Sequence, residues 1–220
     1  MKVSDYISKR VVELGVKHVF MVTGGGAMHL NHSLGTNKDL ECVFNHHEQA
    51  CAMAADSYYR VENKLAVVNV TSGPGGTNAI TGVYGAFVDS IGMVVLSGQV
   101  KFETTVRSTG LHLRQYGDQE LDIVPIVSPI TKYAVMITDV NTVGYHLEKA
   151  FYLAASGRPG PCWLDIPLDI QAANIDPNDQ LRFDPSEIPE VWKTTDIESS
   201  CIDILDHIQN AERPVIYAGS

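Results

Sequence analysis

Basic residues are scarce in this sequence, and no basic run interrupts its acidic character. The 16 Lys and Arg residues are outnumbered by 26 Asp and Glu residues, which gives a formal net charge of -10 at pH 7. Nucleic acids and anionic membranes attract proteins through a basic face. We therefore expect neither a nucleic-acid partner nor a membrane partner for this chain.

Cysteine is also scarce, and its spacing shows no pairing motif. The four cysteines contain no CxxC pair, and three of them lie in apolar runs. This pattern is typical of small buried side chains in a reducing compartment. The start of the sequence lacks the apolar region of a signal peptide, and no run reaches membrane-spanning length. We therefore predict a cytoplasmic protein.

Apolar runs and helical patterns alternate along most of the sequence. With 220 residues, of which 45% are hydrophobic, there is material for one full domain and part of a second. We predict strands at 18–22, 65–70, 93–96, 130–136 and 161–166, and helices at 4–14, 27–34, 77–88 and 140–156. Ser4 is expected to cap the first helix and Gly15 to end it. The alternation predicts an α/β fold, a doubly wound, mainly parallel sheet with helices on both faces.

Residues 41–60 are the most informative stretch. A short apolar run there breaks at His46, His47 and Glu48 before an alanine-rich segment. We interpret it as a strand, a turn and a helix, and the small alanine side chains predict that this helix is buried. Glu48 then lies at the helix entrance, where the helix dipole favours a carboxylate. Capping of the first turn is one interpretation of Glu48, and a functional role is the other.

Two glycine-rich turns follow apolar strands, at 23–26 and 71–76. Such turns let backbone N–H groups approach a ligand closely. Together with the turn before Glu48, they would form a ligand crevice at one edge of the sheet. The dinucleotide-binding fingerprint fits poorly at the first turn, because His29 holds the position of its third glycine. A nicotinamide or flavin Rossmann site is not expected there.

The remaining segments have weaker patterns. Residues 101–118 are irregular, with polar and basic side chains that would suit a mobile loop over a site. Prolines and frequent acids across 173–195 predict an exposed linker. Beyond it we predict an amphipathic helix at 196–209 and a strand at 213–219. We interpret 196–220 as the truncated start of a central α/β domain.

Seven segments carry a resemblance to a known family. In order, they are Val19-Phe20, Gly24-Gly25, His47-Glu48-Gln49, Thr71-Ser-Gly-Pro-Gly75-Gly-Thr-Asn78, Ser97-Gly-Gln99-Val100, Pro129-Ile-Thr-Lys132 and Gly157-Arg-Pro-Gly-Pro161. Together they resemble the N-terminal pyrimidine-binding domain of thiamine-diphosphate-dependent enzymes, and among these the acetolactate synthase large subunits. The resemblance implies that residues 1–172 form this domain.

The resemblance implies a catalytic role for Glu48. Its carboxyl would hydrogen-bond the ring nitrogen of the cofactor's aminopyrimidine and favour the imino tautomer, which activates the cofactor for attack on a 2-keto acid. A dry, apolar setting would suit this role. The cofactor-binding residues implied in the same way are Gly24, Gly25, Thr71, Pro74, Gly75 and Asn78. The residues implied on the substrate side are Gln99, Asp118 and Gln119.

Two positions depart from the acetolactate synthase pattern. Lys101 stands where those enzymes usually have proline, and Asp118 stands where they usually have phenylalanine. A carboxylate in place of an aromatic wall would change which acceptor is favoured. We therefore expect a related decarboxylase and carboligase that acts on another 2-keto acid or on an aldehyde.

The resemblance also implies cofactors and partners. Thiamine diphosphate would be held through Mg²⁺ by a C-terminal domain that nothing in this sequence matches, so the chain alone is expected to be incomplete and inactive. FAD accompanies it in some acetolactate synthases, and this segment does not decide its presence. A shared active site predicts a homodimer or homotetramer. Two alternatives stay open: a pyrimidine-domain subunit of a heteromeric decarboxylase, and a catalytically silent assembly or regulatory chain.

A metal centre is a further alternative. His29, His32, His46, His47 and Glu48 include the side chains of a two-histidine, one-carboxylate iron or zinc site. The mechanism that the resemblance implies needs no metal at these positions. We therefore expect none of these residues to be a metal ligand.

Overall fold

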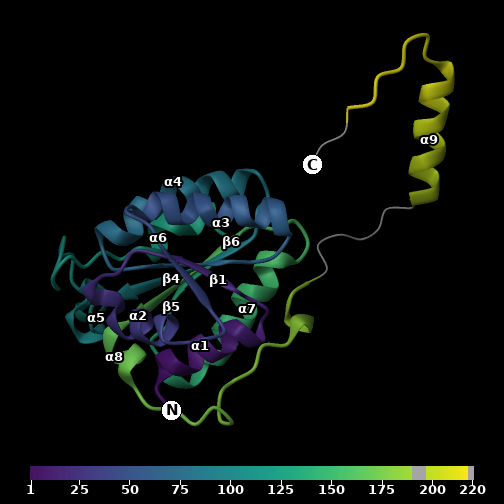
Figure 1. Cartoon of the computed structure of the whole chain (residues 1–220). Coiled ribbons are helices and arrows are strands. Elements are labelled where there is room, and N and C mark those ends of the chain that lie inside the picture. The colour runs from purple at the N-terminus through teal and green to yellow at the C-terminus, as the bar shows by residue number, and fades with distance from the viewer. Residues whose placement is uncertain (190–196, 218–220) are drawn as a thin grey trace. The chain divides into compact units, whose positions relative to one another are not determined.

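The computed structural model describes residues 1–189 and 197–217 (Figure 1). The chain forms two compact units, Met1–Pro185 and Ser186–Ser220. The first unit is a layered α/β domain, and the described part of the second contains the α-helix Ile197–Asn210. All sites discussed below lie in the first unit.

A six-stranded sheet forms the centre of the first unit. Its strands are β1 (His18–Met21), β2 (Glu41–Phe44), β3 (Val67–Val70), β4 (Met93–Gln99), β5 (Tyr133–Met136) and β6 (Pro161–Pro167). They lie in the order β2-β1-β3-β4-β6-β5, and every neighbouring pair is parallel. The prediction of a doubly wound parallel sheet is confirmed.

Helices cover both faces of this sheet (Figure 1). One face carries α1 (Val3–Glu13), α2 (Met28–Gly35), α7 (Val143–Ala155) and α8 (Leu168–Ala172), and the other carries α3 (Glu48–Glu62), α4 (Pro74–Val88) and α6 (Val124–Val127). The central strands β3, β4 and β6 are buried at every position. Because both of their faces are covered, these strands read as continuous apolar runs in the sequence, as parallel strands commonly do.

Successive residues of the central strands enter different cores. On β4, Val94 and Leu96 pack among the helices of the α1 face, whereas Met93 and Val95 pack among those of the α3 face. Each such side chain, when fully buried, contributes roughly 1.5–3 kcal/mol relative to exposure. Burial on two faces therefore holds the sheet, and with it the turns at the ends of its strands.

The ends of α1 differ in part from the prediction. Lys2 holds the N-cap position without a side-chain cap, so the capping role predicted for Ser4 is wrong. Ser4 lies inside the helix, where its hydroxyl accepts a hydrogen bond of 2.9 Å from the Ser33 hydroxyl of α2. Gly15, with φ of 90°, follows the helix as expected. Ser4 therefore joins two helices instead of starting one.

The alanine-rich helix α3 is buried on only one face. Its buried residues are Cys51, Ala52 and Ala55, while Met53 on the same helix is exposed. The prediction that the whole helix is buried is therefore wrong for this chain by itself. The small side chains do allow close packing, because a Cβ at Gly82 of α4 would lie 2.6 Å from that of Ala52.

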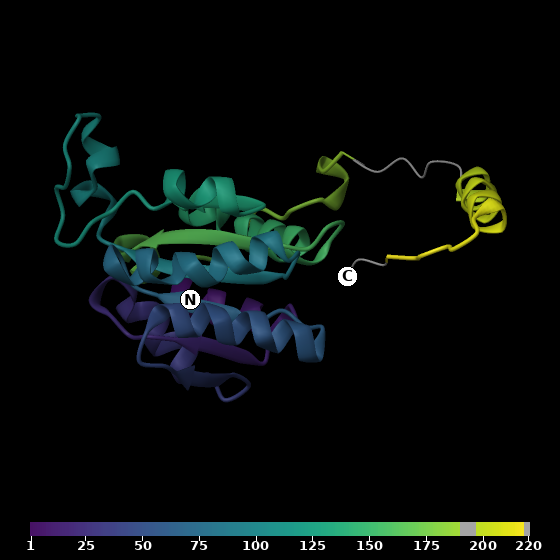
Figure 2. The same ribbon diagram turned by 90° about the horizontal axis from the view of Figure 1, so that it is seen from above.

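The irregular segment 101–118 and the expected linker both contain more structure than predicted. A 3-10 turn, Phe102–Thr104, and the short helix α5 (Val106–Thr109) lie within the first segment, which stands out from the domain in Figure 2. Within 173–185, Ile175 and Gln180 are buried. Gln180 accepts a hydrogen bond of 3.0 Å from the Gly144 N–H, and the Ile175 N–H donates to the Met1 carbonyl at 2.8 Å. The first part of the linker thus packs on the domain.

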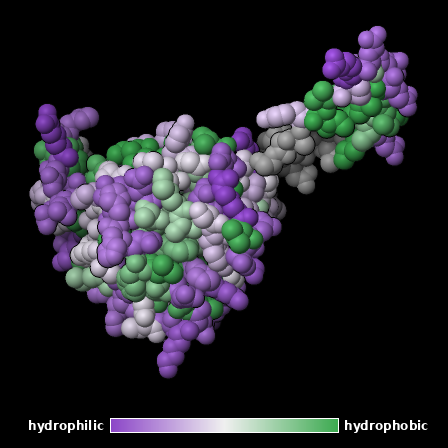
Figure 3. Space-filling view, turned by 45° about the horizontal axis from the view of Figure 1, so that its top comes forward, coloured by the Kyte–Doolittle hydropathy of each residue, from purple (hydrophilic) through white to green (hydrophobic). Residues whose placement is uncertain are grey.

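The second unit contains α9 (Ile197–Asn210), close to the predicted helix. Four large apolar side chains of α9 are exposed, Ile197, Ile202, Ile204 and Leu205, and they give this helix a hydrophobic surface in Figure 3. Residues 211–217 form no strand, contrary to the prediction for 213–219. The linker residues 190–195 and the last residues of that predicted strand lie outside the described part of the chain.

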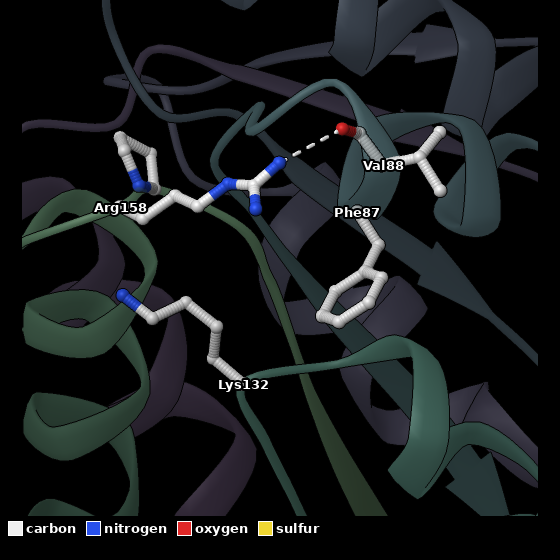
Figure 4. A pocket seen from close by; sticks show the side chains of 5 residues that line it. Phe87, Val88, Lys132 and Arg158 are labelled. Carbon is white, nitrogen blue, oxygen red and sulfur yellow. Dashed lines mark hydrogen bonds between the residues drawn. The ribbon is translucent and has the colours of Figure 1, made fainter.

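Two cations fasten helix ends on the side of the sheet where β5 and β6 begin. Arg158 donates to the Val88 carbonyl at the end of α4, at 3.2 Å (Figure 4). Lys132 donates to the Leu153 and Ser156 carbonyls at the end of α7. They line a cavity of about 380 Å³ with Phe87, Val88 and Pro159. Burial lowers the pKa of Lys132. Cations at helix C-termini interact favourably with the helix dipole and also donate hydrogen bonds to the last carbonyls of the helix.

Replacing Lys132 should measurably destabilise the chain. In Lys132→Met the apolar stem remains, but two carbonyls at the end of α7 lose a charged donor, which we expect to lower the free energy of unfolding by about 1–3 kcal/mol. Urea unfolding followed by circular dichroism would measure it. Lys9→Met, which removes an exposed cation of α1, is the matched control and should change stability by less than about 0.5 kcal/mol. Equal losses in both variants would contradict the role of Lys132.

Candidate functional site

The three turns singled out in the sequence meet at the carboxyl ends of neighbouring strands. Glu48 follows β2, the turn 23–26 follows β1, and the turn 71–76 follows β3, and these strands are adjacent in the order β2-β1-β3. The direction of chain progression reverses at β1 and β3, which is where open α/β sheets commonly bind ligands. The predicted crevice therefore has its structural basis in the strand order.

Glu48 is the first residue of α3 and is half-buried. The capping role goes to His47, whose Nδ1 accepts a hydrogen bond of 3.1 Å from the Gln49 N–H. One Glu48 oxygen, Oε2, accepts a hydrogen bond of 3.0 Å from the Asn78 amide of α4. The other oxygen, Oε1, makes no hydrogen bond among the described residues, and a Cβ at Gly75 would lie 3.7 Å from it. Glu48 thus keeps one acceptor available beside a glycine.

Thr71 joins the two glycine turns. Its hydroxyl accepts a hydrogen bond of 3.0 Å from the Gly26 N–H, and a Cβ at Gly24 would overlap its side chain. A Cβ at Gly75 would lie 2.7 Å from the Thr71 methyl group. The absence of side chains at both glycines therefore allows the turns to approach each other at Thr71.

Two asparagines that sequence reasoning missed connect β3 to the first glycine turn, 23–26. The Asn69 amide on β3 donates to Asn31 at 2.8 Å, and the Asn31 amide donates to the Gly24 carbonyl at 3.1 Å. Asn69 is fully buried, and its Oδ1 has no hydrogen-bond partner in the described chain. A polar residue inside an apolar strand was the available signal. Its partner Asn31 could not be found from spacing alone.

The second turn also contacts the predicted covering loop. Gly73 has φ of 56° and a Cβ there would overlap the carbonyl oxygen of Gln119, which itself has φ of 53°. Pro74 follows as the first residue of α4, which begins three residues earlier than predicted. The structure thus brings the loop backbone at Gln119 against the turn that contains Gly75.

Gly73 should tolerate no side chain. In Gly73→Ala the left-handed φ and the overlap with the loop carbonyl both oppose folding, and we expect a loss of about 1–3 kcal/mol in the free energy of unfolding. The matched control is Gly85→Ala on α4, where a Cβ meets open space. That change should stabilise the helix by roughly 0.5–1 kcal/mol. Chemical denaturation would compare them, and shifts of the same sign would refute this interpretation.

Glu120 holds the base of the loop. Its Oε1 accepts a hydrogen bond of 2.6 Å from the Val106 N–H, and its Oε2 accepts one of 3.0 Å from the Tyr116 N–H. Glu120 is buried, whereas its neighbours Asp118 and Gln119 are exposed. The loop is therefore closed by one carboxylate, with its two predicted substrate-side residues at the surface.

Gln99 is fully buried at the end of β4. Its amide nitrogen donates to the Leu121 carbonyl at 2.7 Å and to Asp165 Oδ2 at 3.1 Å, and its amide oxygen accepts from the Val100 N–H. All polar atoms of Gln99 are thus engaged inside the chain. A direct substrate contact by Gln99 stays a prediction.

Asp165, on β6, is the buried acid beside Gln99. Its Oδ1 accepts a hydrogen bond of 2.5 Å from the Ser97 hydroxyl, which in turn accepts one of 2.8 Å from the Trp163 indole. Burial raises the pKa of Asp165 to about 7, and the bonds from Ser97 and Gln99 oppose that rise. Sequence reasoning missed this network, although an aspartate inside a buried strand was a visible signal.

The raised pKa of Asp165 predicts a pH dependence of stability. Above its ordinary pKa of 3.8 the Asp165 carboxyl ionises first in the unfolded chain. Its contribution to the free energy of unfolding is therefore fully present below pH 3.8 and is lost as the pH rises towards 7. The stability of Asp165→Asn relative to the original chain should therefore rise across this pH window. Urea unfolding at pH 5, 6, 7 and 8 measures this difference. A constant difference would contradict the burial of an ionisable carboxyl here.

The histidines of the alternative metal site are not gathered into one. His32, His46 and His47 are exposed, and His29 is half-buried. In the described ranges, no group of three or more His, Cys, Asp or Glu side chains is placed to hold a metal ion.

The four cysteines are unpaired; Cys51 and Cys162 are buried, Cys42 is half-buried and Cys201 is exposed.

The structure thus places most predicted site residues at the carboxyl ends of β1, β2 and β3, where the crevice is predicted. Glu48 and Asn78 are hydrogen-bonded, Thr71 contacts the glycine turns, and Pro74 and Gly75 open α4. Gly25 begins a 3-10 turn, and open space surrounds its Cβ position. Their functional roles stay predictions.

A parallel α/β domain with glycine turns at its switch point and a carboxylate beside one of them is typical of a ligand-binding domain. Residues 1–126 match the model of the family described as thiamine pyrophosphate enzyme, N-terminal TPP binding domain. Because the match covers more than half of the chain, the chain belongs to this family. The resemblance noted in the sequence is confirmed.

Several acetolactate synthases are similar to this chain. The chain is 36% identical over 227 residues to the acetolactate synthase isozyme 3 large subunit of Escherichia coli (strain K12), covering 98% of this chain and 36% of the relative. It is 32% identical over 216 residues to the acetolactate synthase large subunit of Lactococcus lactis subsp. lactis (strain IL1403), with the same coverage. It is 33% identical over 222 residues to the chloroplastic acetolactate synthase of Arabidopsis thaliana, covering 99% and 31%.

The chain spans about a third of the length of these curated relatives. The parts of the relatives that lie outside the match have no counterpart in the residues described above. In the described part of the chain, no helix has the length and apolar character needed to cross a membrane.

Proposed function

We propose that this chain is the pyrimidine-binding portion of a thiamine-diphosphate-dependent 2-keto acid decarboxylase and carboligase related to acetolactate synthase. The observation that carries the proposal is the position of Glu48, at the start of α3, beside Gly75 of the second glycine turn and with one free carboxylate oxygen. The family match and the names of the relatives support it. When bound, thiamine diphosphate supplies the carbanion chemistry that 2-keto acid cleavage requires.

The residues around Glu48 fit the aminopyrimidine part of that cofactor. Oε1 of Glu48 has no hydrogen-bond partner among the described residues and lies 3.7 Å from the Cβ position of Gly75, so it would be available to a ring nitrogen. Asn78 holds the other oxygen and thereby fixes the direction of the carboxyl group. Gly24, Gly25, Thr71 and Pro74 would complete the pocket. Mg²⁺ and the diphosphate would be held by a domain that this sequence does not match.

Glu48 would hold or share a proton with the pyrimidine ring nitrogen. This role needs a drier setting than the half-buried one that the chain provides by itself. We propose that a neighbouring subunit supplies the rest of the wall in a homodimer or homotetramer. The exposed apolar side chains of α3 and α4, Met53, Val61, Tyr84 and Val88, support such an interface.

The substrate side would lie at the covering loop. Lys101 and Asp118 are both exposed there, and they replace the proline and phenylalanine usual in acetolactate synthases. We propose a 2-keto acid as donor and a more polar acceptor than pyruvate. Gln119 would contribute from the same loop, and FAD would depend on the central domain.

We retain the domain arrangement as part of the proposal. Residues 1–172 would form the pyrimidine-binding domain, 173–195 the linker and 196–220 the start of a central α/β domain. The apolar face of α9 suits a helix that packs against further structure of such a domain. Cytoplasmic localisation stays a prediction from the sequence.

Glu48→Gln in the protein at its natural length tests the proposal. With thiamine diphosphate and Mg²⁺ added, we expect hydrogen-deuterium exchange at the cofactor's C2 to slow by about 10²–10⁴-fold, because an amide cannot share the pyrimidine proton. Nuclear magnetic resonance of quenched samples measures that exchange.

Glu62→Gln is the matched control, since Glu62 is an exposed glutamate at the other end of α3. It should leave C2 exchange unchanged. Equal exchange in Glu48→Gln and in the original protein, with both binding the cofactor, would rule out the role of Glu48.

A further inference from the structure

Asp165 lies at a branch point of two hydrogen-bonded connections. It is fully buried on β6, directly beside Ser97 of β4 in the sheet register. One carboxylate oxygen accepts from Gln99 and the other from Ser97. Both contacts are side-chain hydrogen bonds, additional to the backbone hydrogen bonds that pair β4 with β6.

The first connection leads to the covering loop. The Gln99 amide nitrogen that donates to Asp165 also donates to the Leu121 carbonyl at 2.7 Å. The Gln99 amide oxygen accepts from the Val100 N–H, which fixes the direction of the amide. Two residues before Leu121, the carbonyl of Gln119 packs against Gly73. The loop end at 119–121 is therefore held between Gln99 and the turn 71–76.

The second connection leads to the start of α4. The Ser97 hydroxyl donates to Asp165 and accepts from the Trp163 indole. The Trp163 ring lies 3.6 Å from the Cβ position of Gly76, beside the Ile123 side chain at 3.5 Å. The orientation of Trp163 thus sets how closely the first turn of α4 can pack on the sheet.

We propose that Asp165 is a positioning residue, which through Gln99 and Ser97 holds the loop end at 119–121 and the start of α4 against each other. Its significance for catalysis rests on the function proposed above, because these two segments flank Gly75 and Glu48. The charged residues that act electrostatically on Asp165 are Asp122 and Arg107, which form an ion pair with each other at 2.9 Å. Asp165 makes no contact with the proposed cofactor pocket itself.

Amide hydrogen exchange of the full chain, followed by mass spectrometry without any cofactor, tests the proposal. In Asp165→Leu, which keeps the branched shape but removes both acceptors, segments 117–122 and 71–78 should exchange about tenfold faster. Exchange in α1 and α7 should stay unchanged, because local opening is independent of the rest of the domain. Equal acceleration in all segments would mean a general structural role and would overturn the proposal.

Two single-connection variants sharpen the test and decide it if Asp165→Leu fails to fold. Gln99→Met should release 117–122 and spare 71–78, whereas Ser97→Ala should release 71–78 and spare 117–122. Thr131→Val is the matched control, since its buried hydroxyl donates to the Val127 carbonyl outside both connections. It should change neither segment.

Unchanged protection of 117–122 in Gln99→Met would overturn the proposal, as would unchanged protection of 71–78 in Ser97→Ala. Thiamine diphosphate binding is measured separately, by calorimetry on the protein at its natural length. A protein that fails to bind the cofactor but shows the two exchange patterns would refute the proposed function and retain the role of Asp165.

Discussion

The turn after β1 packs directly against the Thr71 side chain of the turn after β3, and the whole site depends on this contact. Gly24 and Gly75 both approach Thr71, whose hydroxyl also binds the Gly26 N–H. The strand order brings the two turns together, because β1 and β3 are neighbours where the sheet reverses direction. Glu48 then needs only to follow β2, the next strand, to reach the same place. One arrangement of strands therefore positions the carboxylate and both turns.

The fold and the centre of the site could be predicted from the sequence because their signals are local. Strands buried on both faces read as apolar runs, and a glycine turn after such a run marks a carboxyl end of the sheet. The entrance of α3 at Glu48 followed from the change of pattern after Phe44. A local signal can also mislead: Ser4 has the residue type of a helix cap, but its hydroxyl accepts a hydrogen bond from Ser33 of a neighbouring helix.

The support beneath the site could not be predicted, because it depends on which strands are neighbours. Ser97 meets Asp165 only because β6 inserts between β4 and β5, an order that the sequence does not reveal. Asn69 and Asn31 meet in the same way across β3 and α2. Single polar residues in apolar runs are weak signals, since most buried polar groups serve only to satisfy each other. The sequence shows where such a polar residue lies, but it does not show which residue is its partner in the fold.

The closure of the covering loop by Glu120 has a consequence for divergence among related proteins. The carboxylate ties the Val106 and Tyr116 N–H groups together, so the residues between them form a compartment with its own anchor. Its tip, with Leu111, His112 and Arg114, is exposed. Substitutions or insertions at the tip need not disturb Gln119 or the turn at Gly73. Under the proposed function, substrate preference would be free to evolve in this compartment while the residues around Glu48 are inherited unchanged.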